Sequence, residues 1–334
     1  MLSDEFDSVD PAWNDNNYLG RVVDESGFHR GTLDDLEAMW ELDVDEPANG
    51  DPVTETPDDP AEWLDPDVIT FVDNPDETRA PTYDDDMEPL RERMEAETGK
   101  EIEFMTVSSY AATVEALRAR QAHAGAVPAG SVPWAANLAD YVPVATRISG
   151  DDFGYRLYAL TRADMNDIQS VEDFAGRNIA HADPGSNSGH QAPSAFFDDF
   201  FGVTAGEDYE IEFSGGHDQS VRGIGFGDYE AGPVCSTCME NTIEHTDELE
   251  WDDFKIVWAS EPFVGGNWGL VADLHPDIKE GLERAWLETD WDETGVVDLP
   301  HGWTDAVEID YKRHYHNILV TQAYLDTEYE TGEL

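Results

Sequence analysis

The sequence predicts an α/β fold with mainly parallel sheets. The chain has 334 residues of which 40% are hydrophobic, so it can bury at least one large core, and its length favours two domains. From Val68 onward, short apolar runs alternate with segments whose apolar residues recur at helical spacing. Several helical segments also begin or end with capping residues.

The first alternating elements lie between Val68 and the middle of the chain. VITFV is a short apolar strand, and the helix after it carries Met87, Leu90 and Met94 on one face with Gly99 as its C-cap. EIEFMTV is the next strand. The following helix, SSYAATVEALRARQ, is capped by Ser108 or Ser109. The predicted strands here are 68–72 and 101–107, and the predicted helices are 84–99 and 108–121.

The alternation continues through the second half of the chain. SVEDFAG has a start that resembles a capping box, with Ser170 and Asp173 three residues apart. Apolar runs of four to eight residues read as strands, and the segments between them read as helices. The predicted strands are 155–162, 178–182, 209–213 and 254–260, and the predicted helices are 194–202 and 218–227.

Residues 1–65 differ from the rest of the chain. Their one strong helix candidate is TLDDLEAMWEL, where Thr32 is the cap and Leu33, Leu36 and Trp40 belong to one apolar stripe. The proline- and acid-rich segment DEPANGDPVTETPDDPAEWLDPD follows. It is typical of a linker or of an arm that lies on the main body.

The charge of the chain is strongly negative. Asp and Glu number 75 against 18 Lys and Arg, which gives a formal net charge of −57 at pH 7. A surface of this kind suits high salt, where the Debye length falls to about 3 Å, and the composition resembles that of halophilic archaeal proteins. Nucleic acid and anionic membranes are not expected as partners, because no basic face neutralises phosphates.

No apolar run approaches a membrane span, and the N-terminus MLSDEFDSVD lacks the basic and apolar regions of a signal peptide. The chain as given is therefore expected to be soluble.

The stretch DPGSNSGHQAP, residues 183–193, lies between a predicted strand and a predicted helix. A helix N-terminus has unpaired N–H groups and about half a positive charge, so it attracts anions without Lys or Arg. Ser186, Asn187 and Ser188 would add directed donors, and Gly185 and Gly189 allow close backbone approach. The same residues are compatible with an ordinary serine-capped turn, and the local sequence does not decide between the two.

A second stretch, SGGHDQSVRGIGFGDYEAG, places His217 at the start of another helix and Glu230 thirteen residues later. Together the two stretches resemble the phosphate, phosphite and phosphonate substrate-binding proteins of ABC transporters. The family segments DP.STSG...P, G.HD and G.VDA correspond to DPGSNSGHQAP, GGHD and GDYEAG. YAATVEALRAR, GYRLYAL and the closing segment from Ile256 also match, so the resemblance covers roughly Val68 to Leu287.

The resemblance implies a two-lobed periplasmic-binding-protein fold of type II, with a mainly parallel sheet in each lobe and a ligand cleft between them. Lobe one would be 66–160 with 258–334, lobe two 161–257, and 1–65 an acidic extension. The implied ligand-binding residues are Tyr110, Tyr155, Ser186, Asn187, Ser188, His217 and Glu230.

The chain departs from the family pattern at several positions. Asn187 replaces a threonine, and Glu230 stands where the family usually has Asp. Thr237 and Gly266 occupy the places where members that bind aminoalkylphosphonates carry carboxylates for the ammonium group. The resemblance therefore favours a phosphorus oxyanion without an amine.

The resemblance also implies a binding protein rather than an enzyme, monomeric and without cofactor or metal. It would act at the cell surface through a leader or lipid anchor that this chain does not contain, and it would deliver its ligand to a membrane permease. The alternatives are an enzyme on the same fold, related to the thiamine pyrimidine-precursor synthases, and a sensor module for another anion or a metal. Such enzymes carry a denser cysteine motif than CSTC, residues 235–238.

The CSTC pair itself is compatible with a redox pair, half of a metal site, a local disulfide or two free thiols. No second CxxC is present, and His245 is the only further ligand nearby, so the sequence favours the disulfide or the free thiols.

Overall fold

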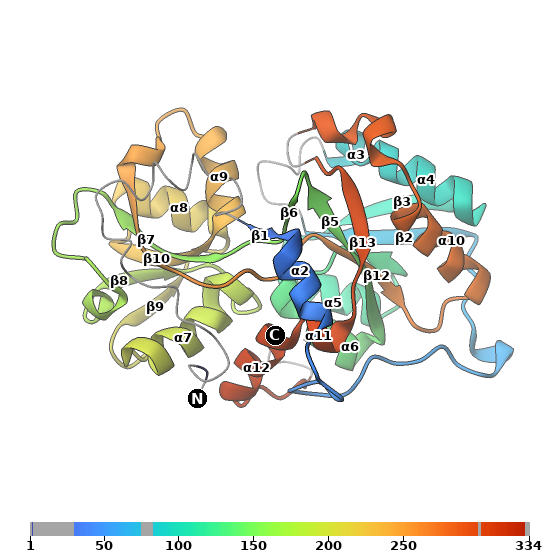
Figure 1. Ribbon diagram of the computed structural model, residues 1–334, viewed down its shortest axis with the longest axis horizontal. Helices are drawn as coiled ribbons and strands as arrows, with labels where there is room; N and C mark the ends of the chain where they lie inside the picture. Colours follow the sequence, from blue (N-terminus) through green and yellow to red (C-terminus); the bar gives the residue numbers. More distant parts are fainter. Residues whose placement is uncertain (1, 3–29, 75–82, 300–301, 331–334) are drawn as a thin grey trace. The chain divides into compact units, whose positions relative to one another are not determined.

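The computed structural model of the chain describes residues 2, 30–74, 83–299 and 302–330 (Figure 1). It contains two compact units. Unit 1 consists of Met1–Thr32, Tyr155–Phe263 and Val320–Thr327, and unit 2 consists of Leu33–Gly154, Val264–Leu319 and Glu328–Leu334. The lobe limits expected at 160/161 and 257/258 fall a few residues inside the long segment of unit 1, and the division into functional lobes stays a prediction.

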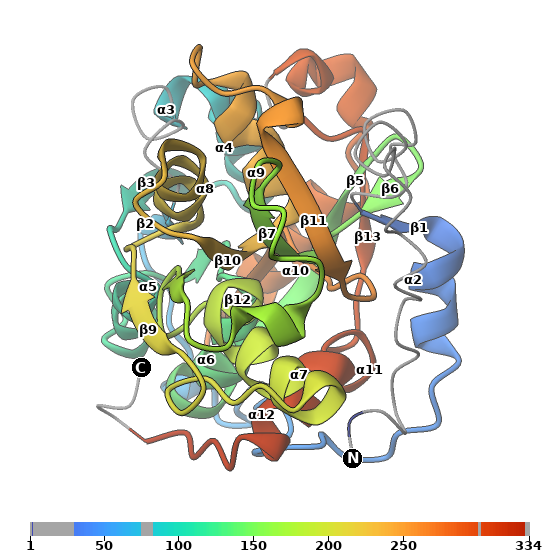
Figure 2. The same ribbon diagram turned by 90° about the vertical axis from the view of Figure 1, so that its left-hand side faces the viewer.

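Unit 1 holds the sheet that carries most of the candidate site. Its strand order is β11-β7-β10-β8-β9. Helices α8 and α9 lie on one side of the strands and α7 on the other, and both views agree (Figures 1 and 2). The elements are β7 (Leu157–Arg162), β8 (Asn178–His181), α7 (Ala192–Phe201), β9 (Glu210–Phe213), α8 (His217–Phe226), β10 (Ala231–Cys235), α9 (Ser236–Glu244) and β11 (Phe254–Ala259).

Two apolar clusters hold these helices on the sheet. Val221 and Ile224 of α8 join Val234 of β10 and Met239 of α9 in one buried core. On α7, Phe196 and Phe197 pack edge-on against Trp258 of β11. Burial on both sides explains why β7, β10 and β11 read as apolar runs in the sequence, whereas the edge strand β9 is mostly exposed.

Unit 2 contains the strands in the order β6-β5-β12-β4-β2-β3, and β13 pairs with β5. The strands are β2 (Val68–Asp73), β3 (Glu101–Thr106), β4 (Ala124–Gly125), β5 (Tyr141–Ser149), β6 (Asp152–Phe153), β12 (Asn267–Val271) and β13 (Asp305–Glu308). The helices are α2 (Leu33–Trp40), α3 (Tyr83–Asp86), α4 (Glu88–Thr98), α5 (Tyr110–Arg118), α6 (Val132–Ala139), α10 (Pro276–Leu287) and α11 (Tyr311–His314); α12 (His316–Tyr324) begins in unit 2, and its residues from Val320 belong to unit 1.

The α/β prediction is confirmed, but the expectation of mainly parallel sheets is wrong, because both sheets are mixed. In unit 1, β8 runs parallel to β9 and β10, whereas β7 is antiparallel to β10 and β11. In unit 2, β2 is parallel to β3 and β4, whereas β12 and β13 are antiparallel to β5. An apolar run reports that a strand is buried on both faces and says nothing about its direction.

Three of the predicted caps are confirmed by the structure. Gly99 ends α4 in the left-handed region with φ 67°, and the Ser109 side chain caps α5 by accepting the Ala112 N–H. Ser170 and Asp173 form the reciprocal capping box. Local chemistry therefore sets the ends of these elements.

The acidic segment after α2 lies along unit 2. The Asp51 N–H donates to Asn137 Oδ1 at 2.8 Å, and the Thr54 hydroxyl donates to Asp140 Oδ1 at 2.9 Å. The Leu64 N–H donates to the Asp273 carbonyl at 2.7 Å. These bonds tie residues 51–64 to the body of that unit.

Candidate functional site

Three parallel strands of unit 1 end at one edge of its sheet, and each leads into a helix. β8 is followed by the π-helical turn η7 (Asn187–Gln191) and α7, β9 by α8, and β10 by α9. Because β10, β8 and β9 are neighbours and parallel, these helix starts gather at the same edge. The N-terminus of a helix carries a partial positive charge, so the edge favours anions.

Ser186 is the N-cap of η7 and is only 1% exposed. Its Oγ accepts the Gly189 N–H at 3.1 Å and lies 3.0 Å from His217 Nε2. The Cys235 N–H donates to the other ring nitrogen, His217 Nδ1, at 3.1 Å. An imidazole that accepts at Nδ1 carries its proton on Nε2, so His217 is neutral and donates to Ser186.

This arrangement fixes what the Ser186 hydroxyl does. Its two acceptor positions are taken by the Gly189 N–H and by the His217 ring, so its own proton has to point to a third atom. Within residues 30–74, 83–299 and 302–330, the structure contains no hydrogen-bond acceptor for that proton. Ser186 is therefore a buried donor whose proton points away from Gly189 and His217, and its role as a ligand contact stays a prediction.

Asn187 and Ser188 follow in η7, and both are 2% exposed. Asn187 Nδ2 donates to the Tyr155 hydroxyl at 3.2 Å, whereas Asn187 Oδ1 is buried without a partner among the described residues. A buried amide oxygen without a partner is costly unless a ligand or water satisfies it. The structure thus places Tyr155 beside Asn187, and Ser186 beside His217; the resemblance implies all four as ligand contacts.

Gly189 has to be glycine for the loop to close in this way. A Cβ at this position would lie 2.5 Å from Ala182 Cβ, 2.8 Å from Ser186 Oγ and 2.9 Å from His217 Cε1. Any side chain here would push Ser186 and His217 apart. The sequence predicted that the backbone at Gly189 is closely approached by other atoms. The structure shows that these atoms belong to Ala182, Ser186 and His217.

A further support comes from the C-terminal helix. Gln322 of α12 donates from Nε2 to Gln191 Oε1 at 2.7 Å, and Gln191 Nε2 points to the Pro184 carbonyl at 3.4 Å. Both glutamines are buried. Gln191 and Gln322 lie 131 positions apart in the sequence, so no local pattern predicts their hydrogen bond. Together they hold the loop before η7 in place.

The buried His181 and the partly buried His190 of η7 form a pair next to the loop. His181 Nδ1 and His190 Nδ1 are 2.9 Å apart, and His181 Nε2 lies 3.0 Å from the Tyr209 hydroxyl. Such a pair shares one proton, because one ring has to donate and the other has to accept. Burial lowers the pKa of His190 to about 4 and holds the pKa of His181 well below its ordinary value.

The histidine pair predicts a loss of stability in mild acid. The folded pKa of His190 lies below the unfolded value of about 6.5, so its contribution is present above that pH and is lost as the pH falls towards 4. We expect wild type to lose about 2–3 kcal/mol more unfolding free energy between pH 7 and pH 4.5 than His190→Gln does. Urea unfolding at fixed molar salt measures this difference. Parallel pH profiles for the two proteins would contradict it.

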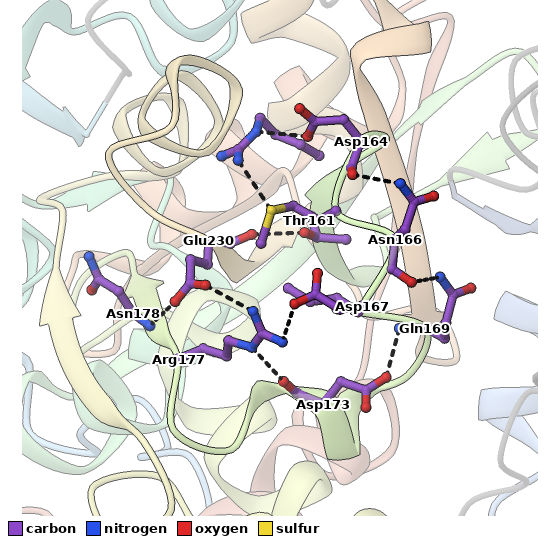
Figure 3. A network of polar contacts seen from close by, with 12 residues as sticks. Thr161, Asp164, Asn166, Asp167, Gln169, Asp173, Arg177, Asn178 and Glu230 are labelled. Carbon is purple, nitrogen blue, oxygen red and sulfur yellow. Dashed lines mark hydrogen bonds and ion pairs between the residues drawn. The ribbon is translucent and has the colours of Figure 1, made fainter.

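Glu230 is not part of this cluster, which corrects the sequence prediction. Its carboxylate accepts from Arg177 Nη1 at 3.0 Å and from the Asn178 N–H at 3.0 Å (Figure 3). The Asn178 N–H, followed by Arg177, holds the pKa of Glu230 below its ordinary value. Glu230 precedes β10, whereas Ser186 follows the parallel strand β8, so the two residues lie at opposite edges of the sheet.

The neighbours of Glu230 form a structural network. Arg177 also donates to Asp167 at 2.7 Å and to the Asp173 carbonyl at 3.3 Å (Figure 3). The Glu230 carbonyl accepts from the Thr161 hydroxyl at 2.8 Å. This network ties the turn before β8 to the start of β10.

We therefore expect Glu230→Gln to affect folding and not binding. The substitution removes the charge of a hydrogen-bonded ion pair that is partly exposed, which costs about 1 kcal/mol of unfolding free energy. Thermal unfolding measures the loss, and calorimetry with phosphite measures the unchanged affinity. If the variant folds normally but binds phosphite much more weakly, Glu230 contributes to the binding site after all.

Tyr110 is the first residue of α5 and belongs to unit 2, whereas the residues above belong to unit 1. It is half-buried. Its role as a ligand contact stays a prediction.

In the described part of the chain, no group of three or more His, Cys, Asp and Glu side chains is placed to hold a metal ion. Cys235 and Cys238 are both free thiols, which is one of the two states that the sequence favours. None of the described helices has the length and apolar character needed to cross a membrane.

Comparison with known proteins shows the same architecture. The binding-protein component of an ABC phosphonate transporter from Pseudomonas aeruginosa superposes with a TM-score of 0.65 at 17% identity, covering 79% of this chain and 89% of that one. PhnD1 from Prochlorococcus marinus, in complex with methylphosphonate, gives a TM-score of 0.66 at 17% identity, covering 78% of this chain and 99% of that one. These similarities show the two-lobed type II periplasmic-binding fold.

Sequence comparison shows the family. The phosphate-import protein PhnD of Mycolicibacterium smegmatis is 30% identical over 277 residues, which cover 78% of this chain and 84% of that protein. The family model described as "ABC transporter, phosphonate, periplasmic substrate-binding protein" matches residues 74–315. The chain therefore belongs to the family of periplasmic substrate-binding proteins of phosphonate ABC transporters.

Proposed function

We propose that this substrate-binding component of an ABC importer takes a small phosphorus oxyanion, namely phosphate, phosphite or a simple phosphonate, at the edge formed by η7, α8 and α9. The observation that carries the proposal is the buried Ser186 hydroxyl, whose two acceptor positions are already filled. A ligand acceptor would complete its hydrogen bonding.

The donors of the site suit an oxyanion because they are neutral and fixed. The helix N-termini and the hydroxyls of Ser186 and Ser188 attract negative charge without a cation. Fixed donors of this kind give short, charge-assisted bonds to a ligand oxygen. The names of the relatives, which import phosphate or bind methylphosphonate, support the same ligand class.

Asn187 supplies the acceptor that a protonated oxyanion needs. A singly protonated phosphate or phosphonate presents one O–H among several acceptor oxygens. Asn187 Oδ1 is buried and has no partner among the described residues, whereas Glu230 is engaged by Arg177. We assign this role to Asn187 in place of Glu230.

The site does not favour an aminoalkyl ligand. The positions at which aminoalkylphosphonate binders carry carboxylates hold Thr237 and Gly266 here. An ammonium group there would lose its water without gaining a counter-ion.

The wider role follows from the family. We propose that the two units are the two lobes, that Tyr110 of unit 2 contributes to the ligand contacts, and that the protein binds as a monomer without turnover. It would work outside the cytoplasm, attached through a leader or lipid anchor, and pass its ligand to a membrane permease. The net charge of −57 supports work in concentrated salt.

Titration calorimetry in molar KCl tests the proposal with phosphate, phosphite, methylphosphonate and 2-aminoethylphosphonate. We expect tight binding of at least one of the first three and weak binding of the last, with the ligand recovered unchanged by phosphorus NMR. Consumption of a ligand would support an enzyme on this fold instead. Absence of binding to all four would exclude the proposed ligand class.

A further inference from the structure

The CSTC motif lies at the first turn of α9, directly after β10. Cys235 is the N-cap residue of the helix, and its Sγ accepts the Cys238 N–H at 3.3 Å. The same sulfur lies 3.2 Å from the Thr237 hydroxyl oxygen. Both cysteines are free thiols.

These contacts prepare Cys235 to react as a thiolate. Burial alone would raise its pKa, but the hydrogen bonds from Cys238 and Thr237 outweigh burial and lower the pKa below that of an ordinary thiol. Cys235 is buried, whereas Cys238 is half-buried and so more accessible from solvent. An external reagent therefore reaches the Cys238 sulfur first, and the buried Cys235 sulfur can then attack the modified Cys238.

Cys235 is also joined to the proposed binding site by a short path. Its backbone N–H donates to His217 Nδ1, and His217 Nε2 bonds to Ser186 Oγ. The sulfur lies at the same strand edge as the helix N-termini that attract the anion, because β10 and β8 are parallel neighbours. A charge on this sulfur acts directly on an anion bound there.

We propose that Cys235 and Cys238 form a reversible disulfide that tightens oxyanion binding; the proposal rests on the proposed function for its effect on the ligand. With a small symmetrical disulfide RSSR as oxidant, the Cys238 sulfur attacks one sulfur of RSSR and releases one RSH. The Cys235 thiolate then attacks the Cys238 sulfur of the mixed disulfide and releases the second RSH. Two protein thiols are oxidised, and RSSR is reduced to two thiols.

The direction of the effect follows from charge. The reduced pair holds a partial negative charge on Cys235 at an edge whose function is to bind a dianion, and the disulfide removes that charge. Neighbouring charged groups, among them Arg156, Glu240 and the Arg30 that pairs with Glu240, do not change in the reaction. Oxidation is therefore expected to lower the dissociation constant.

The test compares the full chain after treatment with oxidised glutathione and after treatment with dithiothreitol, in molar KCl. Free thiols are counted with a chromogenic disulfide reagent, and intact mass detects the loss of two hydrogens. Calorimetry with phosphite, phosphate and methylphosphonate then measures the affinity. We expect the oxidised form to bind about three- to tenfold more tightly at about pH 8.

Cys238→Ser is the matched control, because it keeps the Cys235 sulfur but cannot form the disulfide. We expect its affinity to be the same after both treatments. Two thiols that stay reactive after oxidation, or equal affinities of the two wild-type forms, would overturn the proposal. If neither form binds any oxyanion, the proposed function is wrong, and so is the proposed effect of the disulfide on affinity. The thiol count decides separately whether the disulfide forms.

Discussion

Ser186→Ala is expected to weaken oxyanion binding by about 1.5–3 kcal/mol, roughly 10- to 150-fold in dissociation constant. Ser186 is 1% exposed, and its hydroxyl donates in a direction that the Gly189 N–H and the His217 ring leave open. Alanine removes this donor to a charged oxygen. Calorimetry with the oxyanion that binds wild type most tightly measures the loss, and Ser188→Ala is expected to weaken binding within the same range.

Ser194→Ala is the matched control, because Ser194 lies on α7 just after η7 and its hydroxyl donates to the His190 carbonyl at 2.7 Å. It loses a backbone hydrogen bond of the helix and no donor of the site. We expect its affinity to stay within about twofold of wild type. Unchanged affinity of both Ser186→Ala and Ser188→Ala for every oxyanion would mean that the two serines only cap the turn.

The parts of the site that lie in one strand–turn–helix unit were predictable from the sequence. Ser186, Asn187 and Ser188 follow an apolar strand and precede a helix, and the structure places them there. Their position depends on local chemistry, namely the strand end, the glycines and the cap. The bond from Ser186 to His217, 31 residues away, follows from the family resemblance and not from local pattern.

The Glu230 prediction shows where motif matching fails. The match gave the residue type and the order along the chain, but it ignored the direction of the strand. Glu230 comes before β10 and Ser186 comes after β8, and these strands run parallel. The sequence order of strand and residue could have excluded Glu230, because residues before and after parallel neighbours lie at opposite edges.

The contribution of Cys235 to the site was out of reach of the sequence. It acts on His217 through its backbone N–H, and every residue except proline has that group. The orientation of β7 and β11 was equally out of reach, since antiparallel strands buried on both faces read like parallel ones. Both features depend on tertiary pairing.

The association rate of a dianionic ligand is expected to rise with salt, by about tenfold between ~0.1 M and ~2 M KCl. The net charge of −57 repels a dianion at long range, whereas the donors around Ser186 and His217 are neutral and act at short range. Salt screens the long-range repulsion more than the short, buried contacts. Stopped-flow tryptophan fluorescence measures the rate, and circular dichroism identifies the salt range in which the protein stays folded.

Ser186→Ala separates the two effects, because it removes a short-range donor and leaves the charge of the chain unchanged. Its association rate should rise with KCl as steeply as that of wild type, while its dissociation constant stays higher at every salt concentration. A rate that falls steadily with salt in the folded protein would mean that cations steer the ligand, since only net attraction is weakened by screening. Neutral hydroxyls and helix N-termini would then not be the main attraction at the site, because neither produces a long-range field strong enough to outweigh the charge of the chain.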